Sequence, residues 1–481
     1  MDCFLAKNVR TKKLIYLMPL SEMSENWDDL KRPALHDGFS KKKARTENQL
    51  GLRKLTATGR AFTRCTDEVH ESIDICPVMK VLIDTKHFQR LRYIRQLGTT
   101  YQVYPTANHT RFEHSLGVAH LAKRMAERIQ EFQSYLGTTD KDILCITIAG
   151  LLHDVGHGCY SHLYEDFRGA IERDIKHDEA LQKKYKQYEE VDKEWSHERS
   201  SLATIDAILR SLGQEIDLEN LDKPLKQIGF GFDCVDARTM RVFNGNGSYE
   251  ERDEDDKNEI LTSRDWIFIK ECIFGEPIPK VKEKFGNRRI GRLDDKKEWM
   301  FHVVSNSYSG LDVDKIDYFA RDERRSLGEA GIIKVATQDE ARVAKAKCPN
   351  ETCKKCNRGG YHYMICYPEK CVEAIIEFYR VRYKMHTTVY QHKTGIASGQ
   401  MLVDILKKAD LHCLMTTRSG KKLPISRAVL DEEAFYSLKD TIIDRIVESK
   451  SEELRPAREL AHRFIARKLY SKSKCYSCRC V

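Results

Sequence analysis

The stretch that decides the fold runs from residue 143 to residue 158 and reads ILCITIAGLLHDVGHG. Its first ten residues, 143–152, are apolar on every side of a helix, which is typical of a helix buried in a core. Two ionisable residues, His153 and Asp154, follow directly, and Gly156 offers the helix a stop. Because buried ionisable groups need a partner, the end of this helix is a candidate site.

A metal ion is the simplest such partner. Adjacent residues of a helix point about 100° apart, so His153 and Asp154 reach one ion only at a helix end or a local distortion, which Gly156 permits. His114, in the segment RFEHSLG, and Asp314, in the segment LDVDKIDY, are candidates for the remaining ligands. Two imidazoles and two carboxylates suit Mn, Fe, Zn, Ni or Co better than a cation that takes only oxygen ligands.

A lone His-Asp pair at a helix end usually makes ordinary hydrogen bonds, so the order of the four residues carries the argument. His114 precedes His153 by 39 residues, and Asp314 follows Asp154 by 160 residues. This H…HD…D series is the metal-site order of the HD phosphohydrolases. The sequence therefore predicts a divalent metal site at His114, His153, Asp154 and Asp314.

The remaining pattern predicts a mostly α-helical protein. The chain has 481 residues, 41% of them hydrophobic, which is enough to bury a sizeable core. Apolar residues recur at helical spacing from about residue 61 onward, for example Phe88, Leu91 and Ile94. We expect a helical HD-domain phosphohydrolase core at 61–335 and a smaller mixed α/β C-terminal lobe at 336–474.

The two ends of the chain have different compositions. Residues 1–60 are expected to form a disordered basic arm, since 31–60 carry nine Lys or Arg against two acidic residues. The segment 31–45 has the pattern of a bipartite nuclear import signal, although a solubilising tail would have a similar composition. The last segment, 475–481, is a cysteine-rich tail without the aliphatic residues of a prenylation signal.

Charge and cysteine content indicate the compartment and the kind of partner. The net charge of +9 suits nucleotides or single-stranded nucleic acid. No run of about 18 uncharged apolar residues occurs, so no membrane partner is expected. The cysteines of the apolar segments are expected to be reduced, which favours the nucleus or the cytosol.

Five segments carry a resemblance to a known family: 81–98, 111–118, 149–158, 312–322 and the run Tyr-Gln-His-Lys at 390–393. In this order they resemble the SAM-and-HD-domain deoxynucleoside triphosphate triphosphohydrolases of animals, over roughly 61–470. The resemblance implies hydrolysis of a dNTP to deoxynucleoside and inorganic triphosphate with a divalent ion, Zn, Fe, Mn or Mg. No SAM domain precedes residue 61, and the resemblance ends before the family's terminal lobe.

The resemblance also implies roles for individual residues. His197 matches the catalytic histidine, His157 and His162 match phosphate contacts, and Glu165 stands where the family has an aspartate. Arg111, Lys315 and Arg382 match cations that bind the phosphates, as arginine forks do well. The positions that match sugar and base contacts are Gln96, Leu97, Tyr318, Asp322, Tyr390 and Gln391.

The family is activated by a GTP or dNTP effector that assembles a homotetramer from its dimers, and this chain retains part of that site. The matching positions are Asp84, Gln89, Arg92, Val103, Lys370, His392, Lys393 and Arg467. Where the family has an Asn-Asp-Pro-x-His-Gly run, however, residues 66–71 read TDEVHE, and Thr388 and Pro368 stand at two effector-phosphate positions. We therefore expect a weaker or different effector, with GTP or dGTP as the candidates.

Three alternatives remain open. The first is a nucleic-acid-binding protein that keeps the HD site without turnover, and the second is another HD chemistry, such as phosphodiester or (p)ppGpp-type hydrolysis. The third concerns a cysteine cluster, which could bind structural zinc although the family has a plain hairpin there. Its members are Cys348, Cys353, Cys356, Cys366 and Cys371. By family analogy, the biological role is control of dNTP pools and, through it, antiviral defence and innate immunity.

Overall fold

The computed structural model describes residues 63–188, 195–222, 261–328, 340–347 and 361–470, together with the backbone of three short strands at 235–236, 241–243 and 249–251. The prediction of a mostly α-helical protein is confirmed, because the strands form only small antiparallel sheets. The basic arm, the cysteine-rich tail and the cysteines at 348, 353 and 356 lie outside the described residues.

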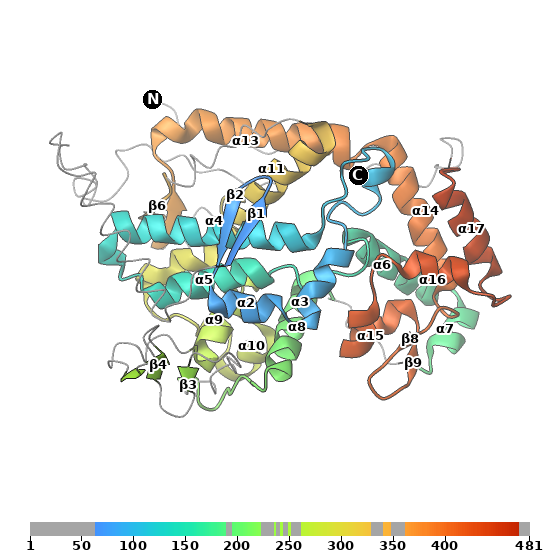
Figure 1. Ribbon diagram of the computed structural model, residues 1–481, viewed down its shortest axis with the longest axis horizontal. Helices are drawn as coiled ribbons and strands as arrows, with labels where there is room; N and C mark the ends of the chain where they lie inside the picture. The colour runs from blue at the N-terminus through green and yellow to red at the C-terminus, as the bar shows by residue number, and fades with distance from the viewer. Residues whose placement is uncertain are drawn as a thin grey trace.

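The elements follow one another along the chain as labelled in Figure 1. The strands are β1 (Thr63–Asp67), β2 (Glu71–Ile75), β3 (Val235–Asp236), β4 (Arg241–Phe243), β5 (Tyr249–Glu251), β6 (Arg342–Lys347), β7 (Tyr361–Cys366), β8 (Met415–Thr416) and β9 (Lys422–Leu423). The helices are α2 (Pro77–Ile83), α3 (Lys86–Gln89), α4 (Arg111–Phe132), α5 (Asp140–Leu152), α6 (His162–His177), α7 (Glu179–Tyr185), α8 (His197–Ser211), α9 (Ser263–Phe274), α10 (Pro279–Phe285), α11 (Val313–Leu327), α13 (Val372–Met385), α14 (Lys393–Ala409), α15 (Glu432–Ser437), α16 (Ile442–Glu448) and α17 (Arg455–Ile465).

The predicted buried helix is α5. It starts with a capping box, in which Thr139 accepts from the Asp142 backbone N–H and the Asp142 carboxylate accepts from the Thr139 N–H. Nearly every residue from Ile143 to Leu152 is buried, and the helix lies against α4 in the centre of the molecule (Figure 1). The helix ends at Leu152, so His153 and Asp154 stand in the turn that follows, as predicted from the helix-end argument.

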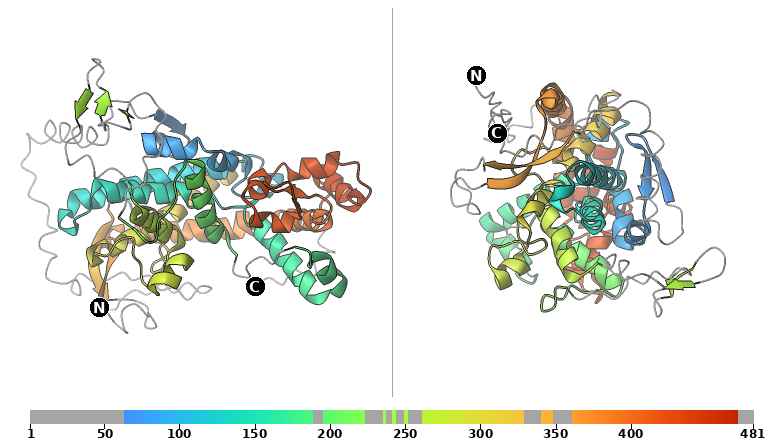
Figure 2. Two further views of the ribbon diagram at one scale, coloured as in Figure 1. Left: turned by 90° about the horizontal axis from the view of Figure 1, so that it is seen from below. Right: turned by 90° about the vertical axis from the view of Figure 1, so that its left-hand side faces the viewer.

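Two hydrophobic clusters share the chain. The first is built around α4, α5, α9, α11 and α13 and includes the hairpin β6–β7. The second joins α6 and α7 to the helices α14–α17, which lie together at one end of the molecule (Figure 2). Each cluster thus takes elements from both sides of residue 335, and the division into a core and a C-terminal lobe there stays a prediction.

The hairpin β6–β7 occupies the region of the cysteine cluster. Cys366 ends β7 and Cys371 is buried shortly before α13, while the other three cysteines lie outside the described residues. Among the described residues, no helix is both long enough and apolar enough to cross a bilayer.

Candidate active site

Four side chains from three helices meet beside the end of α5. His114 lies in the first turn of α4, Asp314 in the first turn of α11, and His153 and Asp154 directly after α5. His114 Nε2 lies 3.1 Å from Asp314 Oδ1, 3.2 Å from His153 Nε2 and 3.5 Å from Asp154 Oδ2. His153 Nε2 lies 3.4 Å from both Asp154 Oδ2 and Asp314 Oδ1. The structure therefore brings the four predicted ligands together.

The donor set fits a divalent ion. Ligand atoms about 2.1 Å from an ion and 90–110° apart lie roughly 3.0–3.4 Å from one another, close to the distances seen here. The tautomer that binds a metal through Nε2 is favoured in both rings, because each Nδ1 has an acceptor. His114 Nδ1 lies 2.7 Å from Asp317 Oδ2, and His153 Nδ1 lies 2.8 Å from the Gly150 carbonyl oxygen. When both Nδ1 atoms donate their protons, two Nε2 lone pairs face each other at 3.2 Å. A metal ion between the two nitrogens, or a proton on one of them, satisfies this arrangement.

The electrostatic field at this point also favours a cation. Burial lowers the pKa of the His114 imidazole, but hydrogen bonds to Asp314 and Asp317 outweigh burial and raise this pKa to about 9. Burial raises the pKa of Asp154, yet the Arg111 guanidinium holds it well below its ordinary value. Burial likewise raises the pKa of Asp314, and hydrogen bonds from His114 and His153 hold it below its ordinary value. Anionic carboxylates around two imidazoles are the environment that a divalent metal ion needs.

Sequence reasoning missed Asp317, which orients His114. This carboxylate is fully buried and accepts from His114, from His70 Nε2 at 2.6 Å and from the Arg321 guanidinium at 3.0 and 3.1 Å. Arg321 also reaches Asp67 at 2.8 Å. A carboxylate behind a ligating histidine fixes its tautomer. The signal was present, because Asp317 lies three residues after Asp314 and four before Arg321, on one side of α11.

Two glycines allow the helices to approach closely enough for this geometry. A Cβ atom on Gly117 of α4 would lie 1.9 Å from Asp317 Oδ1. On Gly156 it would lie 2.0 Å from the backbone nitrogen of Ser201 in α8. The Gly156 N–H donates to Ser201 Oγ, which in turn donates to the His153 carbonyl oxygen at 2.6 Å. Gly156 thus fastens the His-Asp turn to the helix that begins with His197.

His197 belongs to a second cluster with His157, His162 and Glu165. His197 Nδ1 lies 2.7 Å from Glu165 Oε1, and His162 Nδ1 lies 3.6 Å from the same oxygen. The rings of His157 and His197 stack with centroids 4.0 Å apart. Each of the four residues offers one donor atom within 4.8 Å of the others, a set that can bind a metal ion or a phosphate. The longer Glu165 side chain still reaches the imidazole.

The pKa values of His197 and His157 are shifted in opposite directions. Burial lowers the pKa of His197, but its hydrogen bond to Glu165 and nearby carboxylates raise it overall. Burial and the charge of Arg111 hold the pKa of His157 well below the ordinary value. Neither ring nitrogen of His157 makes a hydrogen bond within the described residues, although Nε2 lies 3.3 Å from Asp154 Oδ1. The cluster therefore offers, beside the candidate metal ligands, one imidazole with a raised pKa and one with a lowered pKa.

The predicted phosphate-binding cations border the same space. The Arg111 guanidinium pairs with Asp154 and donates from Nε to Ser161 Oγ at 3.0 Å. Lys315 Nζ donates to Asp312 Oδ2 at 2.7 Å, and the charge of Arg382 acts on Lys315. These cations come from α4, α11 and α13, so they approach from different sides.

Among the residues predicted to contact sugar and base, Tyr318 and Asp322 follow Asp314 at helical spacing along one face of α11. Asp322 accepts from the Tyr390 hydroxyl at 2.6 Å and lies 2.7 Å from His109 Nε2, which sequence reasoning missed. The Tyr318 ring lies 6.4 Å from that of His114. A π-helical turn, His386–Tyr390, presents Tyr390 and ends before the exposed Gln391. The buried Gln96 keeps its Oε1 without a hydrogen bond in the described region, and Leu97 packs against the first cluster.

The predicted effector residues fall into separate groups. Gln89 Oε1 accepts from Arg92 Nε at 2.8 Å, and Asp84 follows α2 directly before them. Arg467 Nε donates to the carbonyl oxygen of Gln102, the residue before Val103. The His392 ring contacts Tyr104 of the same segment, and Lys393, the next residue after His392, is exposed. Lys370 instead pairs with Glu340 at 2.7 Å, at the other end of α13.

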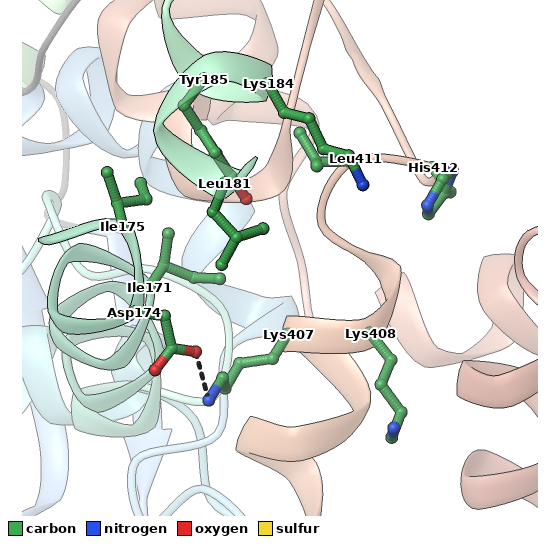
Figure 3. A pocket seen from close by; sticks show the side chains of 10 residues that line it. All are labelled: Ile171, Asp174, Ile175, Leu181, Lys184, Tyr185, Lys407, Lys408, Leu411 and His412. Atoms are coloured by element: carbon green, nitrogen blue, oxygen red, sulfur yellow. Dashed lines mark ion pairs between the residues drawn. The ribbon is translucent and has the colours of Figure 1, made fainter. Parts of the chain in front are cut away.

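A surface pocket between α6, α7 and α14 contains none of the predicted site residues (Figure 3). Lys407 and Asp174 form an ion pair of 2.6 Å across it. Its lining consists of Ile171, Asp174, Ile175, Leu181, Lys184, Tyr185, Lys407, Lys408, Leu411 and His412. It plays no part in the geometry of the two histidine clusters.

Comparison with known proteins agrees with this site. The HD domain model matches residues 111–233, which include three of the four candidate metal ligands. Along 84% of its length the chain is similar, at 32% identity, to the deoxynucleoside triphosphate triphosphohydrolase SAMHD1 of Bos taurus and to that of Homo sapiens. The SAMHD1 homolog of Dictyostelium discoideum is 27% identical over the same share. The matches cover 57%, 54% and 58% of these relatives, so the chain spans about half of their length.

Proposed function

We propose that this chain hydrolyses dNTPs to deoxynucleoside and inorganic triphosphate. The observation that carries the proposal is the close approach of His114 Nε2 and His153 Nε2, which lie 3.2 Å apart beside the carboxylates of Asp154 and Asp314. Arg111 pairs with Asp154 in this cluster, and Lys315 directly follows Asp314 in α11. A divalent ion held by His114, His153, Asp154 and Asp314 would act as a Lewis acid on the α-phosphate.

In the proposed reaction, a bond forms between a water oxygen and the α-phosphorus, and the bond from phosphorus to the sugar 5′-oxygen breaks. Arg111, Lys315 and Arg382 hold the negative phosphate oxygens in place. His197 donates a proton to the departing 5′-oxygen, and the water's proton restores it through solvent. Glu165 supports this role, because its hydrogen bond with Nδ1 raises the pKa of the His197 imidazole.

Sugar selectivity would come from Tyr318 and Asp322. An aromatic ring under the sugar excludes a 2′-hydroxyl by volume, while a carboxylate can bind the 3′-hydroxyl. Tyr390 holds the Asp322 carboxylate in place through its hydroxyl. We therefore expect turnover of dNTPs in preference to rNTPs and weak discrimination among bases.

The test is incubation of purified protein with each dNTP and with Mg²⁺ or Mn²⁺, followed by ion-exchange separation of the products. Deoxynucleoside and triphosphate should appear in equal amounts, and an Asp154→Ala variant should produce neither. If the samples with Mg²⁺ or Mn²⁺ contained a nucleoside diphosphate or monophosphate as the product, or no product, this reaction would be rejected. Lack of turnover together with binding of single-stranded nucleic acid would favour the nucleic-acid-binding alternative.

We further propose that GTP or dGTP promotes a homodimer or homotetramer through the two groups of predicted effector residues. Gln89 and Arg92 already lie in hydrogen-bond contact, next to Asp84. Sedimentation with and without GTP tests this step, and a nucleotide-independent mass would reject it.

The proposed nuclear location rests on residues 31–45, and a 31–45 fusion to a cytosolic reporter tests it. Control of dNTP pools and antiviral defence follow only if turnover is found.

A further inference from the structure

The turn that leads into α6 has an unusual backbone. Tyr160 and Ser161 have φ angles of 57° and 58°, a region that residues other than glycine rarely adopt. His162 follows as the first residue of α6. Such strain persists only where the surrounding structure holds it, and it often marks a functional site. The contacts of this turn therefore show what keeps His162 in place.

Asp440 holds the turn from a distant part of the chain. Its Oδ1 accepts from the Tyr160 backbone N–H at 2.6 Å, and its carbonyl oxygen accepts from the Tyr160 hydroxyl at 2.9 Å. Its Oδ2 accepts from the Arg95 backbone N–H at 2.9 Å. Asp440 itself is buried between α15 and α16, 280 residues after Tyr160. One carboxylate thus joins three separate segments of the chain.

The same contacts continue to a phosphate-binding cation. Ser161 Oγ donates to the Arg95 carbonyl oxygen at 2.7 Å and accepts from Arg111 Nε at 3.0 Å. Arg111 then pairs with Asp154. Because Asp440 fixes both Arg95 and Tyr160, it sets the position of the Ser161 hydroxyl between them. The path from Asp440 to Arg111 consists of hydrogen bonds linked by the backbone of Arg95 and of Tyr160–Ser161.

We propose that Asp440 is a positioning residue for the triphosphate, which acts through Ser161 on Arg111 and through the strained turn on His162. The proposal rests on the proposed function, since it assigns Arg111 and His162 to the phosphates. It adds a contribution of the C-terminal segment to substrate binding, through a residue that touches no substrate. Asparagine cannot replace it, because the Tyr160 and Arg95 amides donate to different carboxylate oxygens and asparagine presents an NH2 group in place of one of them.

The first experiment compares the wild type with Asp440→Asn and, as a matched control, Asp444→Asn on the exposed side of α16. Calorimetry measures the affinity for inorganic triphosphate, and steady-state kinetics measures KM and kcat for a dNTP. Loss of one charge-assisted hydrogen bond predicts an affinity about tenfold weaker and a KM about tenfold higher for Asp440→Asn, with a smaller change in kcat. Asp444→Asn should match the wild type.

Ser161→Ala provides a second test, which leaves the buried carboxylate intact and is needed if Asp440→Asn does not fold. It breaks the same path at the hydroxyl and should also weaken triphosphate binding. If both variants fold, their effects should be less than additive, because they interrupt one path. The proposal would be overturned if a folded Asp440→Asn or Ser161→Ala variant bound triphosphate as tightly as the wild type. It would also be overturned if Asp444→Asn lost as much triphosphate affinity as Asp440→Asn.

The pH dependence separates positioning from a loss of packing. Burial outweighs the hydrogen bonds from Arg95 and Tyr160 and raises the pKa of Asp440 to about 6. The other groups facing it keep their charge states between pH 5 and 7, since arginines stay charged and burial raises the pKa of the thiol and the phenols. They are Arg90, Arg95, Tyr101, Cys159 and Tyr160.

A protonated Asp440 accepts fewer hydrogen bonds, so triphosphate affinity of the wild type should fall more steeply below pH 6 than that of Asp440→Asn. Protonation of triphosphate itself affects both proteins equally. Parallel pH profiles would overturn the proposal. Calorimetry does not depend on turnover, so a wild type that binds triphosphate without hydrolysing dNTPs would reject the proposed reaction and still test Asp440.

Discussion

Replacing Asp317 by asparagine is expected to weaken metal binding at His114 and His153 without removing any ligand. The Asp317 carboxylate accepts from His114 Nδ1 at 2.7 Å, from His70 Nε2 at 2.6 Å and twice from Arg321. An asparagine of the same shape has one acceptor oxygen and presents an NH2 group in place of the other. If the NH2 group faces His114, Nδ1 must become an acceptor, and the proton moves to Nε2.

The size of the effect follows from that proton. A protonated Nε2 has no lone pair for a metal, so the ion must displace the proton or turn the ring. Substitutions of carboxylates behind ligating histidines cost about ten- to a hundredfold in metal affinity, which is about 1.4–2.7 kcal/mol. The change is measured by titrating metal-free protein with Mn²⁺ or Zn²⁺ against a competing chromophoric chelator, with circular dichroism as a check of folding.

Asp67→Asn is the matched control. Asp67 is buried and pairs with Arg321, as Asp317 does, but it has no contact with His114. Asp67→Asn should therefore change stability more than metal affinity. If Asp317→Asn binds metal like the wild type, the tautomer argument is wrong. If both variants lose affinity equally, the effect comes from Arg321 and not from the His114 ring.

Three further predictions concern the site and its supports. In chemical denaturation, Gly156→Ala should lower the free energy of unfolding by about 1–3 kcal/mol, because its Cβ meets the backbone of α8. The control Gly169→Ala should raise the free energy of unfolding, because its Cβ meets only the flexible Arg173 side chain at 3.4 Å. Glu165→Gln should shift the alkaline decline of kcat to lower pH, since the Glu165 hydrogen bond raises the pKa of His197 and the acid must be protonated; an unmoved pH profile would reject this role. Glu71→Gly should stabilise the protein by about 0.5–1 kcal/mol in thermal unfolding, because Glu71 has a φ of 63°.

The sequence alone predicted the features that depend on local order. The apolar run 143–152 forms α5, and the turn after it presents His153 and Asp154. The order of His114, His153, Asp154 and Asp314 predicted a site that spans three helices, and the four residues meet. A metal ion would need its ligands at one point, whatever the path of the chain between them, and the metal site itself stays a prediction.

The supporting residues could not be predicted, because their partners lie far away in the sequence. Asp440 reaches Tyr160 across 280 residues, and Asp317 reaches His70 across 247. No spacing rule connects such pairs, and only packing of the helices brings them together. The same holds for α6, which packs with α14 in the second hydrophobic cluster although the sequence places it in the HD core.

The segment 66–71 illustrates the difference between a motif and its physical use. By comparison with the family's Asn-Asp-Pro-x-His-Gly run, this segment suggested a weakened effector site. The two matching residues, Asp67 and His70, instead point inward, to Arg321 and to Asp317 behind His114. Glu71 stands where the family has glycine and adopts the positive φ that glycine favours. The hairpin shape is therefore kept at some cost in backbone energy, which makes sense if its main task is to hold Asp317 against the metal ligand.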